Sequence, residues 1–405
     1  MSLGLDFLSY LDTLPVFDGH EHLSYPVNGQ RGFFDILHYA QSDLLSAGMP
    51  RKLDDASQTL SERAELFARY YAKSCNTAYF RAVRRYAAGL YGIKRLEGDD
   101  LIRLHAMVRE NDARAEAWYQ NVLEDKCHIR TALTIHDGSQ TRHAILIPVV
   151  YLDFLLRGPQ IQFVSKRLGQ DASFDQYLDY VDDWLRRQFE FGVMAGKFGT
   201  PYWRDMDFIP ADKAAAEREF YSGDERMPSF EGFIFHRVLA EFERRGVPVQ
   251  FHTGHVDPQS ADMRAYRNEW SDPSPFARLA AMYPRLKIVL LHTGFPYSDG
   301  YFSLVKNVPN IYADFSWIYV ISPMLAERNL NLAIETVPLC KVVGFGGDAQ
   351  SVEMTYGHLC MAKEVIARVF AHQVARSWFS RADSEAWMAA LLYDNGAAIY
   401  AMEDS

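Results

Sequence analysis

Two histidines, His20 and His22, stand one residue apart in the stretch VFDGHEHLSYP. In an extended strand, residues i and i+2 point to the same face, so both imidazoles can reach one metal ion while Glu21 points away. Asp18 would share that face one layer deeper, where we expect it to accept a hydrogen bond from an imidazole N–H. The alternative is a pair of half-buried histidines that bind backbone groups.

Four later segments end in the same way, with one ionisable or metal-binding side chain after a short run of apolar and small residues. VMAGK ends in Lys197, VPVQFH in His252, KIVLLH in His292 and VVGFGGD in Asp348. If these runs are parallel strands of one barrel, their carboxyl ends meet at one mouth. The combination favours metal binding, and we predict the ligands to be His20, His22, His252 and Asp348.

Asp348 and Lys197 each allow more than one interpretation. Asp348 could cap a helix that begins near Val352, or it could ligate a metal or take a proton from bound water. Lys197 could extend its amine to the surface, pair with a substrate carboxylate, or become carbamylated and bridge two metals. The sequence does not choose among these possibilities for Lys197.

Other polar side chains follow the same segments into the expected loops. FHTGHVD places His255 three residues after His252, and we predict that His255 faces the substrate. His136 ends the run TALTIH and is predicted to line the same pocket. In GTPYWRD, Tyr202 and Arg204 follow closely after the fourth segment. An arginine there suits bidentate binding of a carboxylate, with a surface salt bridge as the alternative.

Composition limits the partners of this chain. Its 405 residues carry a formal net charge of -10, and such a balance argues against binding nucleic acid or an anionic membrane surface. No apolar run approaches the roughly 20 residues that span a bilayer, and the start lacks a signal-peptide pattern. The four cysteines lie far apart, which indicates reduced thiols. We expect a cytoplasmic protein that binds a small molecule.

Eight short runs rich in β-branched residues must position these groups, and they alternate with helical segments. Such alternation predicts a parallel sheet, and the nearly continuous apolar runs suit strands buried on both faces. Residues 35–125, after the first run, show apolar side chains at three- and four-residue intervals and predict a helical insertion. No G-x-G-x-x-G motif follows a strand, which argues against a dinucleotide-binding sheet.

The predicted fold class is therefore α/β, a (β/α)8 TIM barrel with a helical insertion after the first strand. Residues 1–405 are expected to form one domain, because no repeat, low-complexity tract or linker marks a boundary. We expect the insertion to cap the mouth of the barrel.

With these residues in place, the chain resembles the amidohydrolase superfamily of metal-dependent (β/α)8 enzymes, and within it the amidohydrolase-2 branch. H-x-H on the first strand, histidines on the fifth and sixth, and an aspartate on the eighth follow the order of that family. The nearest resemblance is to the amidohydrolase domain of FluG-type proteins, through VQFHTGHVD, IVLLHTGFPY, NVPNIYADFSW and VVGFGGDA. The helical insertion is similar to that of uronate isomerases.

The resemblance implies roles for individual residues. His20, His22 and Asp348 would belong to the metal site, His252 would be a further ligand, and His292 a ligand or an acid–base group. PYWR after Lys197 resembles the tyrosine and arginine pair of the family. One departure is that Gly346 and Gly347 stand where FluG-like proteins tend to have serine or threonine before the final aspartate.

We expect a metal-dependent hydrolase that cleaves a small carboxylate-bearing amide, ester or lactone. One or two divalent ions, with zinc as the first choice, would lower the pKa of a bound water to about 7 and create a hydroxide nucleophile. Asp348 would accept the proton, and His255 or His292 would polarise the carbonyl. The residues expected to bind the substrate are Lys197, Tyr202, Arg204 and His136.

Two other functions stay open. A sugar-acid isomerase or a nonoxidative decarboxylase could use the same metal ligands, and the helical insertion favours the isomerase slightly. A noncatalytic barrel could use the pocket to bind a ligand. The oligomeric state is also open, although barrels of this kind commonly self-associate into homo-oligomers.

Overall fold

Eight parallel strands, paired in chain order, form the centre of the computed structural model. The structure describes residues 3–24, 30–53, 57–136, 144–157, 172–222, 224, 226–257 and 267–401. The strands are β1 (Val16–Glu21), β2 (Ile129–His136), β3 (Leu146–Tyr151), β4 (Ala195–Phe198), β5 (Val249–Phe251), β6 (Ile288–Leu290), β7 (Ile311–Asp314) and β8 (Val342–Val343). Each of the eight predicted runs contains one strand, and the (β/α)8 barrel prediction is confirmed.

The barrel closes between β1 and the residues that follow β8. Three backbone hydrogen bonds join these segments: Gly19 N to Phe345 O (3.0 Å), Asp348 N to His20 O (2.7 Å) and His22 N to Ala349 O (3.0 Å). Each bond includes a predicted metal ligand or a residue next to one. Closure of the barrel therefore brings the H-x-H motif and Asp348 together.

Side chains that alternate along the strands fill the interior of the barrel. A small buried cluster joins strand residues with two residues from the end of the chain; its members are Phe17, Leu133, Val149, Ala195, Val289, Leu291, Val343, Ile399 and Tyr400. Tyr400 follows α17 (Asn395–Ile399), and its ring stacks on Phe17 with centroids 5.6 Å apart. The C-terminal segment thus packs against the apolar interior.

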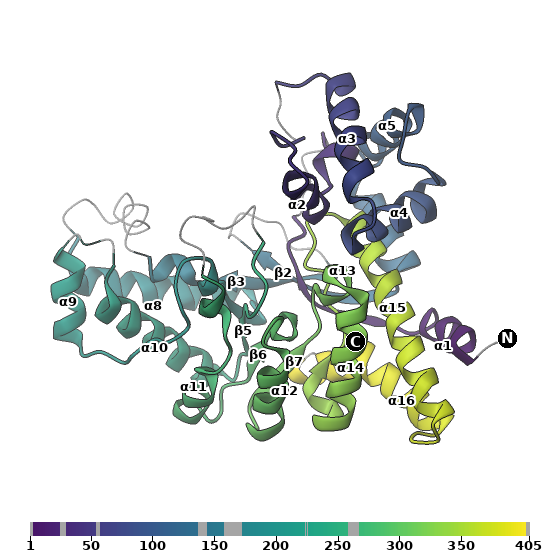
Figure 1. Ribbon diagram of the computed structural model, residues 1–405. Helices are drawn as coiled ribbons and strands as arrows, with labels where there is room; N and C mark the ends of the chain where they lie inside the picture. The colour runs from purple at the N-terminus through teal and green to yellow at the C-terminus, as the bar shows by residue number, and fades with distance from the viewer. Residues whose placement is uncertain are drawn as a thin grey trace.

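Helices cover the outside of the barrel (Figure 1). They are α1 (Leu3–Leu11), α8 (Phe174–Phe191), α9 (Lys213–Ser222), α10 (Pro228–Arg245), α11 (Phe276–Met282), α12 (Ser298–Asn307), α13 (Ile318–Ile321), α14 (Pro323–Thr336), α15 (Val352–Ala375) and α16 (Arg381–Ala389). No helix in the described part of the chain has the length and apolar character needed to cross a membrane.

The local sequence explains how these helices begin and end, as α8 illustrates. Ser173 accepts a hydrogen bond from the backbone N–H of Gln176, whose side chain accepts one from the N–H of Ser173. Gly192, at φ 94°, ends the helix in a left-handed conformation that costs glycine little. Its buried side chains recur every three or four residues and face the barrel: Phe174, Tyr177, Leu178, Val181 and Leu185.

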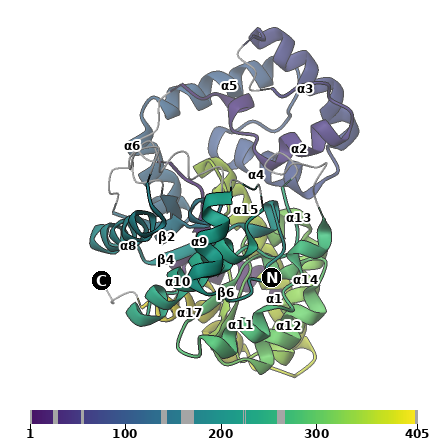
Figure 2. The same cartoon turned by 90° about the vertical axis from the view of Figure 1, so that its left-hand side faces the viewer.

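The predicted helical insertion after β1 is also confirmed. It contains α2 (Tyr39–Ser46), α3 (Leu60–Ser74), α4 (Ala78–Tyr91), α5 (Asp99–Asp112) and α6 (Ala115–Tyr119). In two perpendicular views, α2 to α5 gather at one end of the molecule (Figures 1 and 2). They share a hydrophobic core that also includes Trp317, Met354 and Met361 of the barrel region. The insertion is therefore packed onto the barrel rather than tethered to it.

The contact between α4 and α15 depends on a glycine. A Cβ added to Gly357 would lie 2.4 Å from the carbonyl oxygen of Ala82, which belongs to the backbone and cannot rotate away. We predict that Gly357→Ala lowers the free energy of unfolding by about 1–3 kcal/mol, measured by urea denaturation, because the two helices must separate.

Gly300→Ala is the matched control for this prediction. Gly300 lies exposed in α12, and an added Cβ would have no neighbour within 4 Å. This substitution should instead stabilise the protein by about 0.5–1 kcal/mol, since alanine favours a helix. Equal effects of the two variants would contradict the close packing of α4 on α15.

Candidate active site

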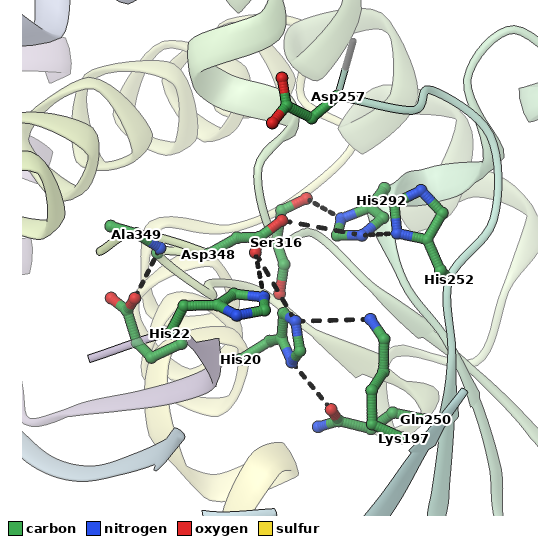
Figure 3. A network of polar contacts seen from close by, with 12 residues as sticks. His20, His22, Lys197, Gln250, His252, Asp257, His292, Ser316, Asp348 and Ala349 are labelled. Atoms are coloured by element: carbon green, nitrogen blue, oxygen red, sulfur yellow. Dashed lines mark hydrogen bonds and ion pairs between the residues drawn. The ribbon is translucent and has the colours of Figure 1, made fainter. Parts of the chain in front are cut away.

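His20, His22 and Asp348 bring three potential ligand atoms together at the carboxyl end of the barrel (Figure 3). All three atoms lie within 4.8 Å of one another. Asp348 Oδ1 is 3.2 Å from His22 Nε2 and 3.6 Å from His20 Nε2. Two imidazole nitrogens and a carboxylate oxygen form a donor set that zinc and related divalent ions prefer.

A glutamine holds the His20 ring in the tautomer that ligation requires. The Nε2 amide of Gln250 donates to Gly19 O (2.7 Å) and to the Tyr400 hydroxyl (2.9 Å), so its Oε1 is left as the acceptor for His20 Nδ1–H at 2.9 Å. The lone pair of His20 Nε2 then points toward Asp348. Sequence reasoning missed Gln250, although a polar residue two places before His252 in an apolar run was a usable signal.

Asp18 was expected to accept a hydrogen bond from an imidazole N–H, and it binds backbone amides instead. Its Oδ1 accepts hydrogen bonds from the backbone amides of His20 (3.3 Å) and Gly347 (3.0 Å), and no imidazole hydrogen bond of Asp18 is found among the described residues. The expectation that Asp18 holds an imidazole was therefore wrong, because Gln250, from β5, occupies that role.

His252 and His292 form a second nitrogen pair beside Asp348. His252 Nε2 is 2.7 Å from the carbonyl oxygen of His255, and His292 Nδ1 is 3.2 Å from that of Ser316. A carbonyl accepts only, so each neutral ring places its one proton there. His252 Nδ1 and His292 Nε2 then face each other as acceptors across 3.1 Å. Two facing lone pairs require a shared cation or proton between them.

Burial makes a cation the better partner for these nitrogens. It lowers the pKa of His292 to about 3 and that of His252 well below its usual range; the charge of Asp348 opposes both shifts, and that of Lys197 adds to them. For Asp348, burial acts to raise the pKa, but the His22 hydrogen bond and electrostatic interactions with His20 and His292 hold it well below its usual range. Neutral imidazoles and an ionised carboxylate are the protonation states of metal ligands.

Lys197 lies against this cluster rather than at the surface. Only 3% of the residue is exposed, and its Nζ is 3.4 Å from His20 Nε2. Burial lowers the pKa of Lys197 to about 8, and the charges of Asp348, Asp153 and Asp314 oppose that shift. The interpretation of Lys197 as an amine that reaches solvent is therefore excluded.

Asp348 is likewise no helix cap. The N-cap of α15 is Ser351, whose hydroxyl accepts a hydrogen bond from Met354 N. Asp348 adopts a left-handed backbone conformation (φ 49°) three residues earlier.

A cavity of about 290 Å³ opens beside these residues. Tyr202 and Lys197 line it as predicted, and Arg157 adds a cation that sequence reasoning missed. The other lining residues are His20, His22, His38, Tyr39, Tyr151, Gly199, Trp203, His252, Asp257, Trp317, Asp348 and Gln350. His38 and Tyr39 come from the helical insertion, so the insertion supplies part of the wall.

Four predicted residues are not among those that line this cavity: Arg204, His136, His255 and the fully buried His292. The guanidinium of Arg204 binds Glu231 of α10 and Asp205, which neutralise it away from the cavity. The ring of His136 stacks on Phe191, with centroids 4.5 Å apart. The ring of His255 lies 5.0 Å from that of Trp317. The backbone carbonyl of His255 accepts the hydrogen bond from His252 Nε2.

Comparisons with known proteins show which family the chain is similar to. A family model described as amidohydrolase matches residues 169–402. Over 364 residues the chain is 25% identical to the protein fluG of Emericella nidulans, a match that covers 82% of this chain and 39% of that protein. The chain thus spans about two fifths of this curated relative.

Solved structures with the same fold are similar over the whole chain. A uronate isomerase of Thermotoga maritima has a TM-score of 0.79 at 14% identity, covering 98% of this chain and 97% of that one. A glucuronate isomerase of Caulobacter crescentus has a TM-score of 0.75 at 18% identity, covering 100% and 94%. A proposed metal-dependent hydrolase of Lactobacillus casei has a TM-score of 0.67 at 18% identity, covering 98% and 97%. At these identities the likeness shows a common fold.

The buried amine predicts a pH-dependent gain in stability from Lys197→Met. Lowering the Lys197 pKa from 10.5 to about 8 costs the folded, metal-free protein roughly 3 kcal/mol whenever the amine is charged in both states. That cost has its full value below pH 8, falls as the pH rises from 8 to 10.5, and is absent above pH 10.5. Lys197→Met should therefore stabilise the chelator-treated protein most below pH 8, measured by urea denaturation.

The exposed Lys213, which pairs with Asp175 on the surface, provides the matched control. Lys213→Met should leave the free energy of unfolding nearly unchanged at pH 7, because an ion pair exposed to water contributes little. A Lys197→Met variant that is no more stable than the parent at pH 7 would contradict the claim that burial of the charged Lys197 amine destabilises the folded protein.

Proposed function

Since this chain belongs to the amidohydrolase family, we propose that it is a metal-dependent hydrolase that cleaves a small carboxylate-bearing amide, ester or lactone. One observation carries the proposal. The two oxygens of Asp348 face separate nitrogen groups: Oδ1 faces His20 and His22, and Oδ2 lies 3.8 Å from His292 Nε2. His20, His22 and Asp348 line a cavity of a size that suits a small molecule.

The residues fit the divalent metal that the family uses. His20, His22, His252 and Asp348 would hold the ion, with zinc as the first choice and one or two ions compatible with the two nitrogen groups. When bound, such an ion would polarise a substrate carbonyl and lower the pKa of a water. Gln250 would keep His20 in its ligating tautomer, as outer hydrogen bonds do at metal sites.

Asp348 and His292 are the groups best placed to move protons. The carboxylate of Asp348 is held in its ionised form, in which it can orient a water and take up its proton. His292 lies next to Asp348 Oδ2 and His252, so it can hand a proton on toward a leaving group. Between His255 and His292 as the residue that acts on the carbonyl, His292 is favoured because its Nε2 lies 3.8 Å from Asp348 Oδ2 and 3.1 Å from His252 Nδ1.

Cations on the cavity wall support a substrate that carries a carboxylate. Lys197 lies deep beside His20, and Arg157 lies at the opening with its guanidinium over the Trp203 ring (5.5 Å to the centroid). Arg157 takes the place that sequence reasoning gave to Arg204, whose charge is neutralised by Glu231. Tyr202 and Trp317 close the wall with aromatic surface and help to exclude water.

An isomerase that acts on a sugar acid is the second candidate. It is supported by the fold likeness to uronate isomerases, which extends over 98% of this chain and includes the helical insertion. An isomerase would use the same ligands without consuming water.

Product analysis in H₂¹⁸O separates these two functions. We expect a screen of lactones, N-acyl amino acids and uronates to yield a hydrolysed product with one ¹⁸O in its new carboxyl group, by mass spectrometry. His20→Ala should abolish the reaction. After metal is removed with a chelator, added zinc should restore the activity of the parent protein but produce none in His20→Ala. Conversion of a uronate to its keto isomer, seen by NMR without any hydrolysis, would contradict the hydrolase and favour the second candidate.

Arg157→Met should weaken substrate binding. Loss of a charge-assisted hydrogen bond costs about 1.5–3 kcal/mol, so KM should rise about 10- to 100-fold while kcat changes less. The control is Arg218→Met, since Arg218 lies exposed on α9, away from the cavity lining. An unchanged KM in Arg157→Met would exclude Arg157 as the carboxylate partner.

A further inference from the structure

Two buried carboxyl groups of β1 hold the backbone on either side of Asp348. Asp18 Oδ1 accepts from Gly347 N at 3.0 Å, and Glu21 Oε2 accepts from Ala349 N at 2.6 Å. Both acidic residues are 0% exposed. Building on the proposed function, we propose that Asp18 and Glu21 are positioning residues that fix the Asp348 carboxylate for metal binding without touching the metal.

The backbone conformation of Asp348 explains why the hydrogen bonds from Gly347 and Ala349 to Asp18 and Glu21 are needed. Its φ of 49° lies in the left-handed region, which L-residues with a side chain avoid. A residue keeps this conformation only when its surroundings over-determine it. Asp348 N itself donates to His20 O at 2.7 Å, so the amides of three consecutive residues are all bound to β1.

The neighbouring carbonyls are fixed as well. Gly346 O accepts from Trp317 N at 3.1 Å, and Gly347 O accepts from His358 Nδ1 at 2.9 Å. Ala349 O accepts from His22 N at 3.0 Å. The segment therefore has little freedom to move relative to the strand that carries both histidines.

Close approach of the backbone to these side chains requires the two glycines. A Cβ on Gly347 would lie 1.9 Å from Glu21 Oε1, and one on Gly346 would lie 1.8 Å from Ser316 Oγ. Any larger residue at Gly347 must displace either the backbone or the Glu21 carboxyl group. The position of the Glu21 carboxyl group therefore depends on glycine at residue 347.

Each carboxyl group also accepts a second hydrogen bond, which fixes its own position. Asp18 Oδ1 accepts from His20 N at 3.3 Å, so one oxygen joins the Asp348 segment to the H-x-H motif. Thr355 Oγ1 of α15 donates to Glu21 Oε1 at 2.7 Å. Loss of either carboxyl group should therefore move Asp348 relative to His20 and His22, and not merely loosen the core.

Zinc binding by the chain of residues 1–405, without substrate, tests the inference. Dissociation constants are measured by competition with a chromogenic chelator for the parent, Asp18→Ala and Glu21→Ala. We expect the two alanine variants to bind zinc about 10- to 100-fold more weakly, as at other outer positions of metal sites. Asp18→Asn and Glu21→Gln keep an oxygen that accepts the same N–H, and should recover binding to within about threefold of the parent.

Two further variants separate positioning from general loss of stability. Asn395→Ala removes a buried amide that donates to Leu339 O and Val342 O before and at the start of β8, so it should destabilise the barrel and leave zinc affinity unchanged. Gly347→Ala keeps both carboxyl groups but displaces Glu21, and should weaken zinc binding like Glu21→Ala. The absorption spectrum of Co²⁺ bound to each folded variant reports changed ligand geometry directly.

The outcomes distinguish this inference from the proposed function. If the parent binds zinc and the folded alanine variants bind it equally well with the same Co²⁺ spectrum, the positioning role is wrong and the proposed function stands. If the asparagine and glutamine variants are as weak as the alanine variants, hydrogen-bond acceptance is not the cause and the inference also fails. If the parent itself binds no zinc or Co²⁺, both the inference and the proposed function are overturned.

Discussion

Closure of the barrel is the constraint on which the site depends. The backbone hydrogen bonds that join β1 to the residues after β8 run through His20, His22 and the segment around Asp348. A parallel barrel of eight strands must make this junction somewhere, and here the junction also brings the proposed ligands together. Closure of the barrel would therefore also form the proposed metal site, and an error in the register between β1 and this segment would separate Asp348 from both histidines.

Much of the fold could be predicted because its signals are local. Apolar runs of strand length alternate with helical periods, and each run contains a strand in the structure. The side chains at the strand ends were predictable as a set, since parallel strands place their carboxyl ends together. The orientation of loop residues was not, because it depends on distant partners: Glu231 neutralises Arg204 from 27 positions away, and Gln250 rather than Asp18 holds the His20 ring.

The helical insertion supplies part of the cavity wall. Tyr39 of α2 lines the cavity and packs on Trp317, with ring centroids 5.0 Å apart. Trp317 follows β7 and also has its ring 5.3 Å from that of His292. Residues far apart in sequence therefore form one aromatic wall beside the ligands. Sequence reasoning could place the insertion near the mouth but could not identify this wall, since aromatic residues in a helical pattern predict a core equally well.

The central claim is that His20, His22 and Asp348 bind a divalent metal, and anomalous diffraction tests it most directly. Crystals of the chain grown with zinc would be measured above and below the zinc absorption edge. The account predicts a strong anomalous peak within coordination distance, about 2.0–2.2 Å, of His20 Nε2, His22 Nε2 and an oxygen of Asp348. Zinc found only on exposed side chains, with no peak among these three residues, would contradict it.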